Sequence, residues 1–447
     1  MSNKKVIVGS EAIYDASKLG TGKMLILGAQ HMFAMFGATV LVPVLTGLSI
    51  STTLLFAGLG TLLFHFITKG KVPAFLGSSF AFLAGYWAIA PNGEAELLPY
   101  ACFAVACSGI LYFILAALIK VFGSKKVMRF FPPIVTGPII IAIGLNLSQS
   151  AIDNCTANWF IAIVAIVIIV ACNIWGKGMV RIVPILLGVI GSYVVAAFMG
   201  EVDFTPVAEA SWVGLPIEWS RTVFSLFPGA DTSLLITAVV TIVPIALATM
   251  VEHIGDVSAI SSTVGINYMK EPGLHRTLIG DGFATSLAAL FGGPANTTYG
   301  ENTGVLTLTK VYDPKVIRIA AIFAVLFSFC PKVSALISCM PAATMGGVSL
   351  VLYGMISAVG VRNIVETKVD FTENRNVLVA ALILVLSIGI NYSSLGAVSF
   401  TIAGITISLS GLAVGSLVGI ILNAVLPGGS YEYNEDNLDP TGVNFEV

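Results

Sequence analysis

Long apolar segments alternate with short polar stretches along nearly the whole chain. A helix that crosses a membrane needs about 20 consecutive apolar residues. Several of the apolar segments are short or contain Gly and Pro in their interiors. The pattern predicts an all-α polytopic membrane protein with about fourteen transmembrane segments. Numbered 1 to 14 in chain order, the candidate spans are 24–47, 51–68, 73–91, 97–119, 130–150, 158–176, 182–199, 235–262, 277–293, 296–312, 316–338, 343–361, 376–392 and 399–426.

The composition supports this class and excludes others. Of the 447 residues, 56% are hydrophobic and only 10% are charged, whereas a soluble domain carries about 25% charged residues. The formal net charge of −2 gives no basic excess that could hold nucleic acid. The six cysteines form no CxxC or Cys/His cluster. We therefore expect no disulfide framework, no metal site and no cofactor.

The distribution of basic residues predicts the orientation in the membrane. Lys and Arg near helix ends are retained on the cytoplasmic face. With fourteen spans and a cytoplasmic N-terminus, 20 of the 22 Lys and Arg residues fall on one side, and only Arg221 and Lys332 fall on the other. We predict a plasma membrane protein with both termini in the cytoplasm, in which 428–447 is an acidic, disordered cytoplasmic tail.

A long loop at 200–233 divides the predicted spans into two sets of seven. It carries Pro and Trp residues that suit the extracellular membrane interface. An odd number of spans in each half means that the second half enters the membrane inverted relative to the first. Inverted repeats of this kind are typical of secondary transporters. Gln30-His31 and Glu252-His253 are separated by 222 residues, and the same offset relates Ser79 to Glu301, which pairs spans 1 and 3 with spans 8 and 10.

Span 8 contains two acidic residues, Glu252 and Asp256, which lie four residues apart on one helical face. Ionisable groups inside hydrocarbon are costly and need a functional or structural reason. Two carboxylates this close cannot both ionise cheaply, so we expect one to hold a proton near neutral pH. The pair therefore predicts a proton-binding site, with hydrogen-bonded bracing of neighbouring helices as the alternative.

Spans 3 and 10 are predicted to break inside the membrane. Span 10 contains many Gly, Asn, Thr and Pro residues between Gly292 and Gly304, and span 3 carries small hydroxyl residues at Ser78 and Ser79. Broken segments at membrane depth survive only where they line a cavity or are buried in protein, and they mark transporter binding sites. For span 3 taken alone, close helix packing is the alternative.

The remaining intramembrane polar residues carry less weight. We expect His31 and His65 to make interhelical hydrogen bonds, and His253 to be structural, because it points about 100° away from Glu252. Asp281 is expected near the cytoplasmic face, either solvated or capping a helix. No HExxH, Walker or GxSxG motif occurs in a suitable context, so we do not expect an enzyme.

Four segments together resemble the nucleobase-ascorbate transporter family, in particular its bacterial uracil permease branch. The resemblance runs from about Leu25 to Leu426 and implies two inverted seven-span repeats. Spans 1–4 (24–122) and 8–11 (234–338) would form a core domain, and spans 5–7 (129–199) and 12–14 (343–427) a gate domain. In that family, spans 3 and 10 contain short strands that meet at the substrate. The four segments are QHMFAMFGATVLVP from Gln30 to Pro43, GSSFAF from Gly77 to Phe82, EHIGD from Glu252 to Asp256 and NTTYGEN from Asn296 to Asn302.

The resemblance also implies roles for particular residues. Glu252 would exchange hydrogen bonds with the pyrimidine edge and would carry the coupled proton beside Asp256, while Glu301 would hold the imide and carbonyl groups on the opposite edge. The remaining substrate-binding residues implied are the backbone amides of Phe80 and Gly300, the walls Ala38 and Tyr299, and Ser79 of span 3.

These features lead to a proton-coupled uracil symporter as the first functional hypothesis. Its partners would be uracil, protons and membrane lipid, and a homodimer through the gate domain is left open. Asp256 replaces the His of the best-known uracil permeases and is similar to the purine branch, so a xanthine or other purine symporter is the alternative. An anion carrier of the same architecture is less favoured, because Glu252 and Glu301 are acidic. A channel is disfavoured because no segment resembles a selectivity filter.

Overall fold

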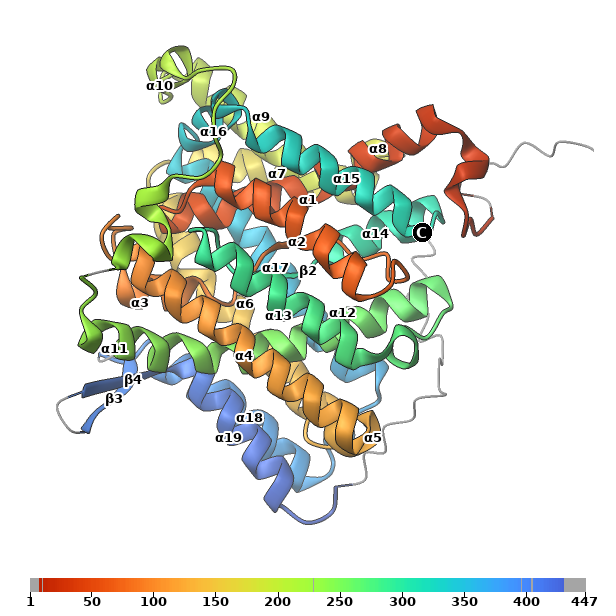
Figure 1. Cartoon of the computed structure of the whole chain (residues 1–447), viewed down its shortest axis with the longest axis vertical. Helices are drawn as coiled ribbons and strands as arrows, with labels where there is room; N and C mark the ends of the chain where they lie inside the picture. The colour runs from red at the N-terminus through yellow and green to blue at the C-terminus, as the bar shows by residue number, and fades with distance from the viewer. Residues whose placement is uncertain (1–7, 10, 228, 395, 403–404, 430–447) are drawn as a thin grey trace, which may run out of the picture.

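The computed structural model describes residues 8–9, 11–227, 229–394, 396–402 and 405–429 and is mostly helical (Figure 1). Within these residues, seven helical segments are long and apolar enough to cross a membrane. They are α1 (Thr21–Thr46), α2 (Ile50–Ile67), α4 (Leu98–Phe122), α6 (Pro133–Thr156), α17 (Ala342–Glu366), α18 (Asn374–Asn391) and the continuous segment of α11 (Thr232–Ile242) and α12 (Ala246–Val264).

Shorter elements occupy the other predicted spans. An eighth crossing is formed if α15 (Pro314–Ser328) and α16 (Pro331–Ser338), which meet at 84°, count as one bent span. The predicted polytopic helical fold is confirmed, while the count of fourteen crossings stays a prediction, because several elements are shorter than a full span. These are α3 (Leu83–Ile89), α7 (Trp159–Trp175), α9 (Pro184–Phe198), α13 (Leu274–Leu290), α14 (Gly300–Thr309) and α19 (Gly411–Val425); α5 (Ser124–Met128), α8 (Met179–Ile182) and α10 (Thr205–Glu209) are surface turns of helix.

Side-chain caps set the starts of several helices. Ser49 accepts a hydrogen bond from the backbone N–H of Thr52 before α2, and Asn158 accepts one from Phe160 before α7. Asp231 and Asp313 cap α11 and α15 in the same way. Each cap satisfies one of the backbone donors that the first turn of a helix leaves without a partner.

The predicted breaks in spans 3 and 10 are confirmed. Strand β1 (Leu76–Ser78) pairs antiparallel with β2 (Asn296–Thr298), with Gly77 opposite Thr297. Figure 1 shows β2 in the interior of the helical bundle, and every residue of both strands is buried. The pairing satisfies backbone groups that hydrocarbon could not.

The prediction of a continuous helix over 399–426 is wrong in its first part. Strands β3 (Ala397–Ile402) and β4 (Ile405–Ser410) form an antiparallel hairpin, and the helix α19 begins only at Gly411. Apolar and polar residues alternate through this segment, as in Val398-Ser-Phe-Thr401. Alternation is the pattern of a strand, and a count of apolar residues alone does not detect it.

The two halves of the chain pack through equivalent helices, each of which contacts the other half. Helix α2 packs against α15 and α4 packs against α13, so the second helix of each half contacts the fourth span of the other. The pairs α7 with α9 and α18 with α19 repeat one another, and α6 packs along α17. A Cβ added at Gly144 of α6 would overlap the backbone carbonyl of Tyr353 in α17. This arrangement is the one that the predicted inverted repeat requires.

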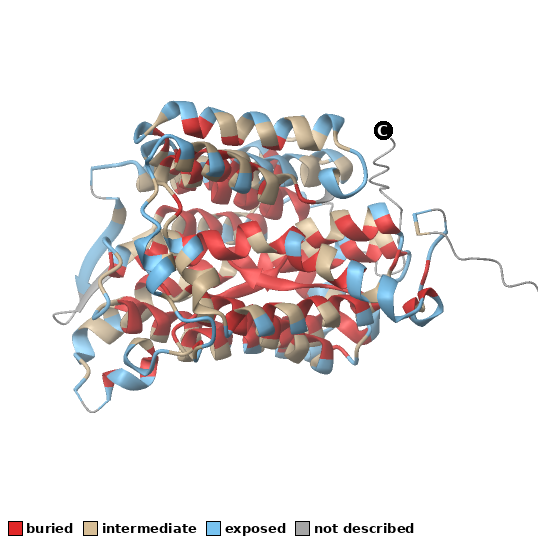
Figure 2. Cartoon of the chain, turned by 90° about the horizontal axis from the view of Figure 1, so that it is seen from above, coloured by how far each residue is buried: buried red, intermediate tan, exposed pale blue. Residues whose placement is uncertain are grey.

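These contacts define two sets of helices. The strand-bearing group contains α1 to α4 and α12 to α15 together with β1 and β2, and the flanking group contains α6 to α9 and α17 to α19. Figure 2 shows that the buried positions gather between the layers of helices rather than on their outer faces. The two groups meet where α1 contacts α9 and where α12 contacts α6 and α19.

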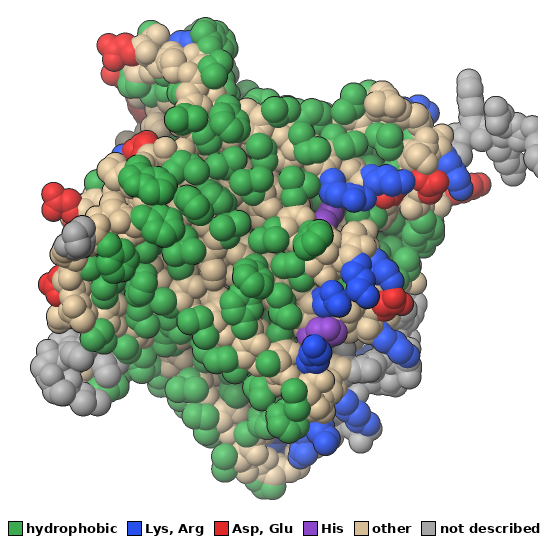
Figure 3. Space-filling model, in the orientation of Figure 1, with side chains coloured by type: hydrophobic (Ala, Val, Ile, Leu, Met, Phe, Trp, Pro, Cys, Tyr) green, Lys and Arg blue, Asp and Glu red, His purple; other side chains and the backbone are tan. Residues whose placement is uncertain are grey.

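The surface carries the charge asymmetry that the sequence predicts. Figure 3 shows Lys and Arg side chains along one edge of the visible face, acidic side chains at the opposite edge, and hydrophobic side chains between them. The 200–233 loop lies at the acidic end and holds α10 and two 3₁₀ turns. The predicted disordered tail lies outside the described residues from 430 onward.

Candidate functional site

The strand pair is held in place by one threonine from each half of the chain. Thr61 on α2 accepts a hydrogen bond from the amide of Leu76 at 2.9 Å. Thr285 on α13 donates one to the carbonyl of Asn296 at 2.7 Å. Each threonine lies on the helix that precedes the strand of its own half. The two repeats therefore fix their strands with the same kind of contact.

A helix begins close after each strand. Helix α3 begins at Leu83 and α14 begins at Gly300. The first N–H groups of a helix have no partner within it and carry a partial positive charge. Within the described residues, the backbone amides of Phe80 and Gly300 have no backbone hydrogen-bond acceptor. Both amides are therefore free to bind a carbonyl oxygen.

Three carboxylates surround the start of α14. Glu252 and Asp256 lie on α12, which packs against α14, and Glu301 is the second residue of α14. All three are partly exposed. Asp256 accepts a hydrogen bond from the Thr298 hydroxyl at 2.8 Å, whereas one carboxylate oxygen of Glu252 is buried without a hydrogen-bond partner. A cluster of this kind can exchange hydrogen bonds with a polar ligand and can hold a proton.

The other predicted substrate residues converge on the same strands. The Tyr299 hydroxyl donates to the carbonyl of Ser78 at 2.9 Å, and its ring lies 2.6 Å from where a Cβ of Gly77 would be. Only Gly fits against that ring. Ala38 of α1 is fully buried, and the next residue along, Thr39, accepts a hydrogen bond from Ser78 through its carbonyl at 2.9 Å.

Ser79 and Phe80 directly follow β1. Ser79 is buried and its hydroxyl has no hydrogen-bond partner within the described residues. The Phe80 ring meets the Tyr353 ring of α17 edge to face, with the ring centroids 5.8 Å apart. Phe80 therefore joins the strand-bearing group to the flanking group.

The predicted interhelical hydrogen bond is confirmed for His31, whereas His65 bonds to a segment that is not helical. Asn302 of α14 donates through its side-chain amide to His31 of α1, at 3.1 Å from the ring Nδ1 and 3.1 Å from the backbone carbonyl. The Nε2 of His65 lies 2.9 Å from the carbonyl of Ala74, in the segment that leads to β1. Both histidines connect different elements of the bundle.

Asp281 is not solvated and does not cap a helix, contrary to expectation. Its side chain on α13 is 0% exposed, and its Oδ2 lies 3.4 Å from the Nδ1 of His253. The cap of α13 is Gly273, eight residues earlier. The position of a residue along a span does not reveal depth here, because α13 is enclosed by α2 and α4.

His253 is closer to the acidic face of α12 than the helical geometry of Glu252 suggested. Its Nδ1 lies 3.4 Å from the Thr298 hydroxyl that donates to Asp256. His253 and Asp256 are three residues apart and therefore share a side of the helix. Thr298, which sequence reasoning did not select, links them; its place in the NTTYGEN segment was the available signal.

Exposure differs along α12 on the two sides of the carboxylates. Ser258 and Ala259, two and three residues after Asp256, are exposed, and Gly300 at the start of α14 is exposed as well. On the other side of Glu252, Met250 and Thr249 are buried. Among the described residues no group of three or more His, Cys, Asp or Glu side chains could hold a metal ion.

A buried strand pair at the crossing of two broken spans, inside an inverted-repeat helical bundle, defines a secondary transporter. The comparison with known families agrees. The model described as the permease family matches residues 22–396. The chain belongs to this family of nucleobase-ascorbate transporters, which confirms the resemblance read from its motifs and makes it a transporter rather than an enzyme.

One relative is similar to the chain in sequence, and two solved structures are similar to it in fold. It is 41% identical over 418 residues to the uracil permease of Bacillus caldolyticus, covering 91% of this chain and 93% of that protein. The structure of SLC26A9 shares the fold with a TM-score of 0.65 at 12% identity; 90% of this chain is covered, but it spans only 64% of that chain. The transmembrane domain of the cyanobacterial bicarbonate transporter BicA gives a TM-score of 0.56 at 14% identity, covering 90% of this chain and 97% of that one.

Proposed function

We propose that this protein imports uracil by proton symport across the plasma membrane. The observation that carries the proposal is the cluster of Glu252, Asp256 and Glu301 beside two free backbone amides at the strand crossing. Uracil is flat and neutral and offers N–H donors beside carbonyl acceptors, which carboxylates and amides match. The 41% identity to a uracil permease over most of both chains supports this substrate.

In the proposed complex, uracil lies between the strand ends. Glu301 accepts hydrogen bonds from the ring N–H groups on one edge, and Glu252 binds the other edge. The amides of Phe80 and Gly300 donate to the carbonyl oxygens. Ala38 and Tyr299 enclose the flat faces, and the unpartnered Ser79 hydroxyl supplies a further polar contact.

The proposed coupling proton resides on Glu252, with Asp256 as its neighbour on the same face of α12. Asp256 is oriented by the Thr298 hydroxyl at 2.8 Å, whereas Glu252 keeps an oxygen without a partner. A carboxyl that contacts substrate and also binds the proton couples the two by a shared site. Binding of one then favours binding of the other, which is the requirement for symport.

We further propose that transport uses movement of the strand-bearing group, as the core domain, against the flanking group, as the gate domain. In this proposal, the movement exposes the strand crossing to one side of the membrane at a time, and substrate is released toward the cytoplasm. The two groups meet through side-chain packing such as Phe80 against Tyr353 rather than through a shared strand. A homodimer through the gate domain remains a prediction.

A purine substrate is the second candidate, because an Asp stands at position 256. Xanthine carries the same imide edge as uracil on a larger ring, so the hydrogen-bonding groups alone do not separate the two. An anion carrier fits less well. The fold is shared with a bicarbonate transporter, but the site residues here are acidic and would repel an anion.

The test is uptake of radiolabelled uracil into proteoliposomes that contain the purified protein. An inward proton gradient should accelerate uptake, and an uncoupler should reduce it to the rate of equilibration. Unlabelled xanthine and bicarbonate serve as competitors in parallel reactions. Uptake that ignores the gradient would overturn the coupling, and stronger competition by xanthine than by uracil would reassign the substrate.

A further inference from the structure

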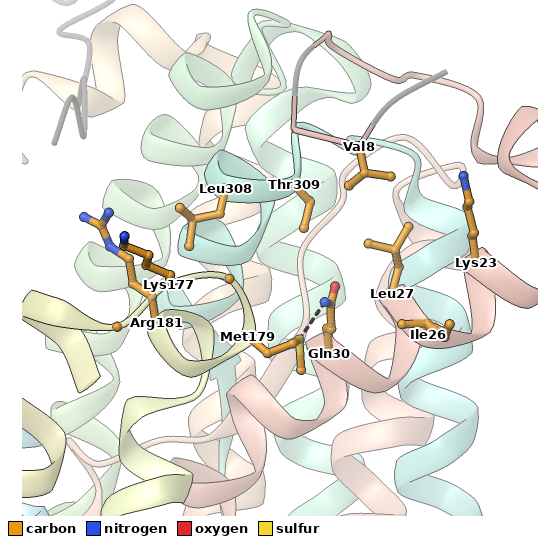
Figure 4. A pocket seen from close by; sticks show the side chains of 12 residues that line it. Val8, Lys23, Ile26, Leu27, Gln30, Lys177, Met179, Arg181, Leu308 and Thr309 are labelled. Carbon is orange, nitrogen blue, oxygen red and sulfur yellow. Dashed lines mark hydrogen bonds between the residues drawn. The ribbon is translucent and has the colours of Figure 1, made fainter. Parts of the chain in front are cut away.

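A cavity lies away from the carboxylates, where α1, α8 and the end of α14 come together. Its volume is about 510 Å³, and no residue of α12, β1 or β2 lines it. Figure 4 shows Lys23 on one side, Lys177 and Arg181 on the other, and Gln30 between them. The proposed uracil site therefore does not account for this cavity.

The cavity is positively charged and lacks compensating acidic groups. Lys23, Lys177 and Arg181 line it, and no Asp or Glu does. Elsewhere on the molecule, Lys71 pairs with Glu271 and Arg362 pairs with Glu366. Within the described part of the chain, none of the three cavity bases has a carboxylate within ion-pair distance. A neutral nucleobase forms no ion pairs with three cations, whereas a phosphate group forms strong charge-assisted hydrogen bonds with them.

Gln30 adds a second, independent observation. Its side-chain oxygen is buried and has no hydrogen-bond donor, while its amide nitrogen contacts only the Met179 sulfur, at 2.6 Å. A thioether is a weak acceptor. A buried amide oxygen without a hydrogen-bond donor is costly, and Gln30 lines the same cavity as the three bases. A ligand with both an anionic oxygen and a hydroxyl donor would satisfy it.

The apolar lining distinguishes a lipid from a soluble anion. Ile26 and Met179 line the cavity and are 63% and 42% exposed. Trp175, just before the lining segment, is largely exposed as well. An acyl chain would cover these side chains, while inorganic phosphate would leave them uncovered. Basic cavities between helices on the cytoplasmic side suit anionic lipid headgroups.

We propose that this cavity binds the headgroup of an anionic phospholipid and that the bound lipid bridges the two helix groups. Lys23 and Gln30 belong to α1 of the strand-bearing group. In the flanking group, Lys177 lies just before α8 and Arg181 lies in α8. A phosphate held from both sides stabilises the arrangement described here, in which α1 and α8 are in contact. The lipid thereby acts on the movement that transport requires.

The test measures thermal unfolding of the purified full-length protein in a mild detergent. The additives are phosphatidylglycerol, phosphatidylcholine and inorganic phosphate at equal concentration. A ligand that binds only the folded state raises the midpoint, so phosphatidylglycerol should raise it by about 3 °C or more at saturation. The variant Lys23→Gln/Lys177→Gln/Arg181→Gln should lose this rise.

The matched control is Lys125→Gln/Lys126→Gln/Arg129→Gln, which removes the same amount of positive charge. Lys125 and Lys126 are exposed residues of α5, and the exposed Arg129 follows that helix directly. The control should keep the full rise. Equal loss in both triple variants would show general surface electrostatics and overturn the proposal, as would an equal rise with phosphatidylcholine or with inorganic phosphate. If the triple variant does not fold, the single variant Lys177→Gln replaces it and should lower the affinity for phosphatidylglycerol by at least about threefold.

The readout for uracil separates this proposal from the proposed function. Uracil itself should still raise the unfolding midpoint of the triple variant, because none of its three residues contacts the strand crossing. In proteoliposomes, uptake by the wild type should change with the fraction of phosphatidylglycerol, and uptake by the variant should not. A wild type that responds to uracil but not to this lipid would refute the lipid site alone.

Discussion

The two halves of the chain contribute the same scaffold to the strand crossing but different chemistry. Thr61 in the first half and Thr285 in the second each form a hydrogen bond with the backbone of the strand in their own half. After β1 the chain continues with the neutral residues Ser79 and Phe80. After β2 it continues with Tyr299, Gly300 and the acidic Glu301.

The first helix of each half differs in the same way. In α1 the polar residue His31 is occupied by a structural hydrogen bond to Asn302, whereas α12 presents Glu252 and Asp256 toward the crossing. All the carboxylates of the site thus come from the second repeat. The comparison teaches that the repeat supplies a place for the ligand, while the asymmetry between the repeats supplies the ability to bind protons and to orient the ligand.

The largest effect is expected from Glu301→Gln. The change replaces an acceptor oxygen with a donor that faces another donor, so uracil affinity should fall by roughly 10- to 100-fold. Ligand-induced thermal shift and equilibrium binding measure it. The control is Glu271→Gln, an exposed Glu of the same half that pairs with Lys71 outside the site. Equal affinity in wild type and Glu301→Gln would remove Glu301 from the site.

Glu252→Gln should separate binding from coupling. The amide imitates a protonated carboxyl, so uracil should still bind within about threefold of the wild-type affinity. Accumulation driven by a proton gradient should be lost, because the coupled proton has no carrier. Binding and gradient-driven uptake are measured on the same preparation. If the variant still accumulates uracil against a gradient, the proton is carried by another group.

Asp256→Asn should shift the pH optimum of transport more than its maximum rate. Asp256 is the charged neighbour of Glu252 and does not itself hold uracil in the proposed complex. Thr298→Val, which removes the hydroxyl that donates to Asp256, should shift the same profile by a smaller amount. Uptake across a series of pH values measures both. A large fall in maximum rate with an unchanged pH profile would make Asp256 a substrate ligand instead.

The smallest effect is expected in the first repeat. Ser79→Ala removes one neutral hydroxyl, and the loss of a neutral hydrogen bond weakens affinity by only about 2- to 10-fold. Ser399→Ala, in the exposed β3–β4 hairpin, is the control. A loss as large as that of Glu301→Gln would show that the two repeats contribute equally, against the comparison made above.

Much of this architecture could be predicted from the sequence. The apolar segments predicted the helices. The Gly, Asn and Pro residues between Gly292 and Gly304 predicted the break in span 10, where β2 lies. The parity of the two sets of spans gave the inverted repeat that the packing shows. These features depend on local composition or on counting, and neither needs knowledge of distant contacts.

Other features depend on contacts that no local pattern contains. The burial of Asp281 follows from enclosure of α13 by α2 and α4, far apart in sequence. The link that Thr298 makes between Asp256 and His253 exists only after β2 is seated beside α12. The hairpin from Ala397 had a usable signal in its alternation, but the high apolar content of that segment resembled a span.

The pairing of β1 with β2 also has a consequence for biosynthesis. When the ribosome has made only the first half, the backbone of β1 has no strand to pair with, although hydrocarbon does not tolerate such a segment. Its partner follows more than 200 residues later in the chain. The unpaired backbone of β1 must therefore be shielded by other helices or by the insertion machinery until the second half has been synthesised. Two half-length polypeptides produced in the same cell should each be incomplete alone and should assemble into a functional carrier together.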